Sequence, residues 1–342
     1  MADSSQSFFS RYAPAPSRDK EEPPSTVQET YIPVETGFLL TDSVLPFDLY
    51  YLSPENRLEK IIEAGDKTAP QIISQILRGE FKKQCFVMET QKEEYLLFQE
   101  KSVDTMLNNS RLPMQLRCRS LYGLSVVLAQ EAFEHPNGLT AYRLVEHVER
   151  LVKFVFRESP KVLRTLINMG HREYSDAVHS VNVGLYALDI ALEHYGKRSN
   201  KDFNDMTAGF FLHDIGKTRV RPGILDKPGP LEEPEWWEVK KHPRYGYLML
   251  EREGILSEES REIVLSHHER MDGEGYPDLL EARNIHPYAR ICAVADAYDA
   301  LTTKRVFRSK LPPFDALRTM KEEMQTQFDP EIFKTFVLLL RR

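Results

Sequence analysis

His267 and His268 offer two adjacent imidazoles just before a charged turn and the loop Gly275-Tyr276-Pro277. No apolar face surrounds this pair, so core packing does not account for it. Neutral imidazole binds iron, manganese and zinc, and a turn can direct both rings to one point. Taken alone, the stretch is equally typical of two solvated histidines at the surface.

The dipeptide His213-Asp214 closes the apolar run of residues 209–212. Imidazole is a borderline metal ligand and carboxylate a hard one, and a carboxylate can bridge two cations as a single histidine cannot. Lys217 follows by about one helical turn, so it shares a face with the pair if the helix continues that far. The dipeptide therefore predicts a ligand pair with a cation beside it.

Three further residues of ligand type fall on other predicted helices. His179 lies in an amphipathic run, and Asp296 lies on a helix with an apolar inner face. His242 precedes Pro243, which favours a loop-to-helix boundary. Each has an ordinary alternative, because His179 suits a core histidine and Asp296 beside Asp299 suits a solvated face. As a set, five of the ten histidines and two aspartates can converge on one site.

This ordered set resembles the HD-GYP family, a branch of the HD-domain metal-dependent phosphohydrolases whose usual substrate is cyclic di-GMP. A His-Asp dipeptide alone is a weak signal, whereas the full set is a strong one. The resemblance covers about residues 171–342, half of the chain. It rests on His179, His213-Asp214 with Lys217, His242, His267-His268, Gly275-Tyr276-Pro277 and Asp296, in that order.

The resemblance implies a cyclic di-GMP phosphodiesterase with an all-helical metal site. It implies two divalent metal ions per chain, iron or manganese, with a bridging hydroxide that attacks phosphorus and gives pGpG, and slower conversion to GMP. Asp214 would bridge the ions, and Lys217 would steady the phosphate or help the ribose oxygen leave, so both are implied catalytic residues. The implied metal ligands are His179, His213, Asp214, His242, His267, His268 and Asp296.

A second stretch carries the implied substrate contacts. Residues 299–308 resemble the family's Asp-Ala-Leu-Thr-x-x-Arg-x-Tyr-Lys/Arg run. A guanidinium grips a phosphate with two parallel hydrogen bonds, so Arg305 and Arg308 are candidates for the non-scissile phosphate; a basic helix end is the alternative. Tyr276 would lie at the pocket mouth, where it could stack on guanine, shape the loop or touch a partner. A diguanylate cyclase (GGDEF) protein could bind through Gly275-Tyr276-Pro277.

Two other functions stay open at this point. One is a signalling module that binds cyclic di-GMP or a diguanylate cyclase without useful turnover, and the other is a phosphohydrolase for another nucleotide. The complete ligand set favours the enzyme, since a binding module does not need every metal ligand. The Gly-Tyr-Pro loop disfavours a different nucleotide.

One position departs from the family pattern and bears on the number of metal ions. Members that bind three metals carry a glutamate one helical turn before the first histidine. This chain has Ser175 there, and a neutral hydroxyl is a poor ligand for a third divalent cation. Asp176 lies three residues before His179 and could reach the site only with some rotation. We therefore expect two metals per chain.

Composition sets the outer limits. The chain has 342 residues, a net charge of -7 and 41% hydrophobic residues, which is typical of globular proteins and argues against binding of nucleic-acid polymers. Its three cysteines show no disulfide or metal spacing and suit a reducing compartment. The sequence shows no basic start followed by an apolar core and no apolar run of about 18 residues, so we expect a cytoplasmic protein without a signal peptide or a membrane span.

The predicted fold class is mainly α, in four parts. Residues 1–29 are a disordered tail rich in Ser, Pro and charge, and residues 30–108 a small α/β sensory or interaction domain. Residues 109–168 form a helical connector that could extend the bundle or pair with a second copy as a homodimer, and residues 169–342 form the all-helical catalytic domain.

Within these parts the expected elements are specific. Short β-prone runs predict strands at residues 37–40, 46–52 and 85–88, and helical spacing appears at residues 72–77 and from Tyr95. A helix is expected from about residue 174 to residue 194, with His179 near the edge of its buried stripe. Four histidines match no family position and are predicted to be structural or solvated: His135, His147, His194 and His286.

Overall fold

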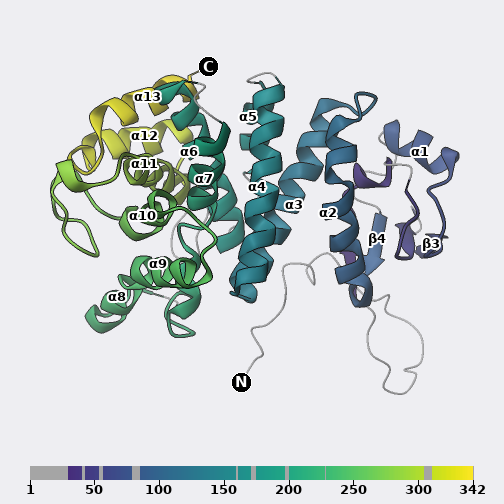
Figure 1. Cartoon of the computed structure of the whole chain (residues 1–342), viewed down its shortest axis with the longest axis horizontal. Helices are drawn as coiled ribbons and strands as arrows, with labels where there is room; N and C mark the ends of the chain where they lie inside the picture. The colour runs from purple at the N-terminus through teal and green to yellow at the C-terminus, as the bar shows by residue number, and fades with distance from the viewer. Residues whose placement is uncertain are drawn as a thin grey trace. The chain divides into compact units, whose positions relative to one another are not determined.

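The computed structural model of the chain describes residues 30–40, 43–53, 57–78, 85–158, 161–170, 175–196, 200–227, 229–303 and 310–341 (Figure 1). It divides into two compact units, residues 1–124 and 125–342, and the division falls within helix α3 (Met114–Glu134). Helices make up most of the described chain, which confirms the mainly α fold class. The predicted disordered tail and the predicted substrate residues Arg305 and Arg308 lie outside the described residues.

The first unit contains a small antiparallel sheet with helix α2 (Lys92–Asn108) against it. Phe47 is wholly buried and meets the rings of Tyr95 and Phe98 of α2 edge-on, with ring centroids 5.2 and 5.5 Å apart. The predicted small α/β module is therefore present. Its sheet order among the described residues is β1 (Tyr31–Pro33), β4 (Cys85–Met88), β2 (Leu49–Leu52) and β3 (Leu58–Ile62), with α1 (Pro70–Leu77) between β3 and β4 in the chain.

The strand at residues 85–88 was predicted at its observed bounds, but the strand predicted at residues 37–40 is wrong. Phe38–Leu40 forms a 3-10 turn, in which the amides of Phe38 and Leu39 donate to the carbonyls of Glu35 and Thr36. All three of its side chains are buried, and a short run of apolar residues fits a strand and a helical turn equally well. Strand β3 was missed because it exposes charged residues at the sheet edge, and β1 was missed because it has only three residues, the last of them a proline.

The second unit is a bundle of helices joined by loops and 3-10 turns (Figure 1). No described helix is both long and apolar enough to cross a bilayer. Its helices are α4 (Gly138–Arg157), α5 (Lys161–Ile167), α6 (Asp176–Tyr195), α7 (Asn200–Phe211), α8 (Glu233–Val239), α9 (His242–Glu253), α10 (Glu258–Ser266), α11 (Pro287–Thr302), α12 (Pro313–Glu322) and α13 (Pro330–Leu340), with the 3-10 turn η4 (Ile215–Arg219) after α7.

Helix α6 is the centre of this bundle, and it corrects one expectation. It was predicted as amphipathic, with His179 near the edge of the buried stripe, but most of its side chains are buried and His179 is 1% exposed. Helices α5, α7, α11 and α13 all pack against it, so it has no solvated face along most of its length. Periodicity within α6 could not reveal this, because two of the covering helices, α11 and α13, come from distant parts of the chain.

The helix starts follow ordinary capping chemistry. The Ser175 hydroxyl accepts the Val178 amide at the start of α6, and Ser257 accepts the Ser260 amide at the start of α10. Pro243 occupies the first turn of α9, as the His242-Pro243 pair predicted. Helix α9 ends at Gly254, which adopts a left-handed backbone conformation.

Candidate metal centre

Three histidines reach the centre from the ends of three different helices. His213 follows α7, His242 follows α8 and His267 caps α10. In each, the Nδ1 atom faces the backbone carbonyl three residues earlier, at 2.9, 2.7 and 2.9 Å for Phe210, Val239 and Val264. Carbonyls in the last helical turn lack intrahelical partners, so they are available to hold these rings.

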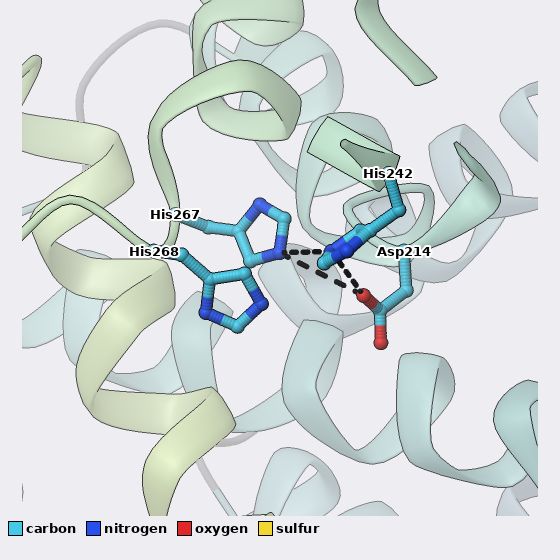
Figure 2. A group of neighbouring side chains, drawn as sticks. All are labelled: Asp214, His242, His267 and His268. Carbon is cyan, nitrogen blue, oxygen red and sulfur yellow. Dashed lines mark hydrogen bonds and ion pairs between the residues drawn. The ribbon is translucent and has the colours of Figure 1, made fainter. Parts of the chain in front are cut away.

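This arrangement determines which nitrogen of each ring faces the centre. A carbonyl oxygen only accepts a hydrogen bond, so Nδ1 carries the proton and a neutral ring presents the Nε2 lone pair. The Nε2 atoms of His242 and His267 face each other at 3.3 Å (Figure 2). Two lone pairs repel at this distance, and a cation between them removes the repulsion. The rings therefore fit a metal ion.

The seven predicted ligands lie in two adjoining groups, and within each group the possible ligand atoms are all within 4.8 Å of one another. Among the described residues, the Nε2 atom of His213 and the Oδ1 atom of Asp214 are buried without a hydrogen bond. A buried polar atom without a hydrogen-bond partner lowers the stability of the folded protein, unless a bound ion takes the place of the partner. The first cluster is Asp214, His242, His267 and His268, and the second cluster is His179, His213 and Asp296.

The two oxygens of Asp214 face different sets of rings. Oδ1 lies 3.1 Å from His242 Nε2 and 3.7 Å from His267 Nε2 (Figure 2). Oδ2 lies 3.3 Å from His213 Nε2 and 3.5 Å from His179 Nε2. One carboxylate can therefore contribute an oxygen to each cluster.

Asp214 is held as an anion although it is buried. Burial opposes its ionisation, but the cations and donors around it, Lys217 and His213 first, keep its pKa well below the usual range. The Lys217 ammonium lies 2.5 Å from Asp214 Oδ2, as predicted from its position in the chain. A carboxylate whose pKa favours the ionised form and a cation thus lie at the junction of the two clusters.

Close backbone packing brings Asp214 and His242 together. Turn η4 begins directly after Asp214 and packs on the first turn of α9. A Cβ atom at Gly216 would overlap the carbonyl oxygen of His242 and the amide nitrogen of Gly246. Only glycine permits this approach.

The Gly-Tyr-Pro loop closes one side of the first cluster. Tyr276 stacks on His268, with centroids 4.6 Å apart and planes 29° apart. Glu269 is buried, and its carboxylate accepts the amides of Asp278 and Leu280 at 2.7 and 2.9 Å. Glu269 therefore holds the loop against the ligands, a role that sequence reasoning missed because a lone glutamate after two histidines carries no distinctive signal.

Asp299 is the second residue that was missed. Its Oδ2 atom lies 2.7 Å from His179 Nδ1, and its Oδ1 atom accepts Asn182 Nδ2 at 3.0 Å. The residue is 1% exposed, so the solvated alternative considered for the Asp296 and Asp299 pair does not hold for it. The available signal was its spacing, one helical turn after Asp296 on the same face of α11.

We expect Asp299→Asn to weaken metal binding and any metal-dependent activity by about 10- to 100-fold, because the amide is a weaker acceptor for His179. The measurement is metal content and affinity after anaerobic loading. Asp315→Asn, a partly exposed aspartate on α12, is the matched control and should behave as wild type. Full metal affinity in Asp299→Asn would show that its hydrogen bond does not orient the ligand.

Metal binding to the second cluster should strengthen as pH rises. Burial opposes protonation of His179, but Asp296 and Asp299 outweigh it and raise its pKa to about 9. A coordinated imidazole must lose that proton, so below this pKa the affinity should rise by about tenfold per pH unit. Burial lowers the pKa of His267 to about 4, so this ring is already neutral and adds no such dependence near pH 7.

Calorimetric titration of the metal-free chain with Mn(II) at pH 6.5, 7.5 and 8.5 measures this slope. A constant affinity across these pH values would show that His179 is neutral before the metal binds.

The remaining predictions for this region have mixed outcomes. Ser175 is used as the cap of α6, and Asp176 is in neither cluster of the described residues. His147 is buried and bonded to Ser125 at 2.8 Å, and His286 accepts an amide at the start of α11, so both are structural as predicted. Cys292 is buried in α11.

Comparison with known proteins agrees with this geometry. A family described as HD domain matches residues 162–332. The cyclic di-GMP phosphodiesterase PA4108 of Pseudomonas aeruginosa is 37% identical over 178 residues, which cover 52% of this chain and 42% of that protein. The 3'3'-cGAMP-specific phosphodiesterase 3 of Vibrio cholerae is 38% identical over 157 residues, which cover 46% of this chain and 34% of that protein. The match thus spans less than half the length of either relative.

A solved structure shares the fold over most of the chain. Bd1817, a HDG"Y"P protein from Bdellovibrio bacteriovorus, has a TM-score of 0.64 at 18% identity. The superposition covers 91% of this chain and 100% of that protein.

Proposed function

Because the chain belongs to the HD domain family, in its HD-GYP branch, we propose that it is a metal-dependent phosphodiesterase that opens cyclic di-GMP to linear pGpG. The observation that carries the proposal is the pair of adjoining clusters with one Asp214 oxygen directed to each. Two ions held by these clusters would suit in-line displacement at phosphorus, and Asp214 would be a ligand to both.

The donor set guides the choice of metal. Five imidazoles and two carboxylates are a borderline set that suits first-row divalent metals, and we propose iron or manganese. Bound there, the ions would supply Lewis acidity and lower the pKa of water to near neutrality.

The chain's own residues would then position the phosphate and its leaving group. Lys217 offers a positive charge beside Asp214 for a phosphate oxygen or the departing ribose oxygen. Asp299 keeps His179 directed at its cluster. Arg305 and Arg308 are proposed to bind the non-scissile phosphate, and Tyr276 to contact the nucleotide at the mouth of the site.

The test is hydrolysis by the full chain, purified without oxygen and loaded with Fe(II) or Mn(II). Cyclic di-GMP should disappear and pGpG appear on chromatography, and a chelator should stop the reaction. Cyclic di-GMP, 3'3'-cGAMP and a linear dinucleotide are compared because relatives bear names of both cyclic substrates. Tight binding of cyclic di-GMP without product by the metal-loaded chain would instead indicate a signalling module, and turnover of other nucleotides only would indicate a different phosphohydrolase.

We expect two ions per chain, and pGpG rather than GMP as the main product. The Ser175 hydroxyl already accepts the Val178 amide, so a third ion would lack a ligand on the first turn of α6. Metal analysis per folded chain after anaerobic loading measures the ratio. Three ions per chain, or anomalous scattering from an ion at Asp176, would contradict this expectation.

The other parts of the chain are proposed to regulate this activity. Residues 30–108 carry no cluster of catalytic residue types and would act as a sensory or interaction domain, with residues 109–168 as the connector. A diguanylate cyclase partner at the Gly275-Tyr276-Pro277 loop and a homodimer are proposals of the same kind, and binding and light-scattering measurements test them.

A further inference from the structure

Helix α8 carries two neighbouring tryptophans that leave much of their surface in water. Trp236 is 46% exposed and Trp237 60% exposed, and Val239 is the buried residue of this helix. Val239 joins a small core with Val220 and Ile224, which holds the helix on the bundle. Burial of a large aromatic side chain is favourable, and this pair forgoes that stabilisation. An exposed aromatic pair beside a catalytic centre therefore suggests a surface that a ligand covers.

The ammonium group of Lys240 lies over three aromatic rings. Its Nζ atom is 5.8 Å from the centroid of Trp236, 5.1 Å from that of Trp237 and 5.5 Å from that of Tyr276. Within the described ranges no carboxylate forms an ion pair with Lys240, whereas the next residue, Lys241, pairs with Glu238 at 3.1 Å. Lys240 thus orients the three aromatic side chains through cation–π contacts. Its positive charge stays available to attract an anion.

This surface is continuous with the metal clusters. Tyr276, one of the three rings around Lys240, stacks on His268 of the first cluster. The carbonyl of Val239, adjacent to Lys240, receives the Nδ1 proton of His242. Figure 1 shows α8 beside α9 at the border of the bundle, where the two helices end and begin next to each other. A dinucleotide whose phosphate lies at the metal clusters could therefore also contact the aromatic surface.

We infer that Trp236, Trp237 and Lys240 form a purine-stacking subsite for the cyclic dinucleotide. One base stacks on the exposed indole surface, with Trp237 as the more exposed ring, while Lys240 orients the indoles and attracts the anionic substrate. The chemistry is that of single-stranded nucleic-acid binding, in which any base stacks on an aromatic ring and a nearby cation adds electrostatic attraction. This inference rests on the proposed function for the nature of the ligand.

Tryptophan fluorescence tests the subsite without turnover, because the chain has only two tryptophans and both are in α8. A hydrolysis-resistant phosphorothioate analogue of cyclic di-GMP, added to the Mn(II)-loaded full chain, should quench the emission. In Trp237→Ala its dissociation constant should rise by about tenfold, and Trp237→Phe should restore most of the affinity. An analogue that binds by calorimetry without changing the emission would overturn the inference.

Turnover supplies an independent test. For Trp237→Ala, the ratio of kcat/KM for cyclic di-GMP to kcat/KM for bis(p-nitrophenyl) phosphate, which has no base, should fall by about tenfold. Two controls should keep the wild-type ratio: Tyr142→Ala, an exposed aromatic on α4, and Lys241→Gln. An unchanged ratio in Trp237→Ala, with wild type active on both substrates, rejects the subsite alone. If the metal-loaded wild-type protein hydrolyses neither substrate, the proposed phosphodiesterase function is rejected instead. The fluorescence titration then still tests the subsite.

Discussion

Replacing Asp214 with alanine should release metal from both clusters and reduce hydrolysis of cyclic di-GMP by about 10⁴-fold or more. The substitution removes the oxygen 3.1 Å from His242 and the oxygen 3.3 Å from His213, so each cluster loses a charged ligand. It also leaves Lys217 without the carboxylate that it contacts at 2.5 Å, next to the bound cations. Metal content per chain and single-turnover hydrolysis after anaerobic loading measure both effects.

Two variants sharpen the Asp214 experiment. Asp214→Asn keeps the shape but removes the negative charge, and we expect it to lose most of the activity while folding normally. Asp226→Ala removes an exposed aspartate and should behave as wild type. An Asp214→Ala protein with full metal content and rate would show that the ligand assignment is wrong.

The second large effect is expected from Gly216→Ala. A methyl group there would overlap backbone atoms of His242 and Gly246, and backbone cannot rotate away as a side chain can. We expect the free energy of unfolding to fall by about 3 kcal/mol, the upper end of the usual cost of overpacking. Because the shift separates η4 from α9, it also moves Asp214 from His242, so metal retention should fall as well. Thermal unfolding and metal analysis on the same preparation measure the two losses.

The control is the same substitution at another helical glycine. A Cβ atom at Gly123, in α3, would meet only the Glu35 side chain at 3.1 Å, which can move. Alanine favours a helix over glycine by about 1 kcal/mol, so Gly123→Ala should keep or raise the stability. Equal stability of Gly216→Ala and wild type would show that η4 and α9 are not held at the distance described.

The sequence by itself determined the chemical identity of the centre. His179, His213, Asp214, His242, His267, His268 and Asp296 were selected by residue type and order, and these seven residues form the two clusters. Residue type determines which atoms can bind a metal, and the helical spacing around His242 and Asp296 was enough to place them on helices. Arg305 and Arg308 rest on the sequence alone, since they lie outside the described residues.

Only the tertiary structure decided how these atoms face one another. The carbonyls that orient His213, His242 and His267 belong to ends of three helices, and their convergence depends on how α7, α8 and α10 pack. The partner of His179 is 120 residues away, at Asp299. The burial of α6 on nearly all sides has the same origin, because α11 and α13, more than 90 residues later in the chain, complete its cover. Local patterns record the periodicity of one segment, whereas the convergence of the three rings and the two faces of Asp214 depend on contacts between segments that are distant in sequence.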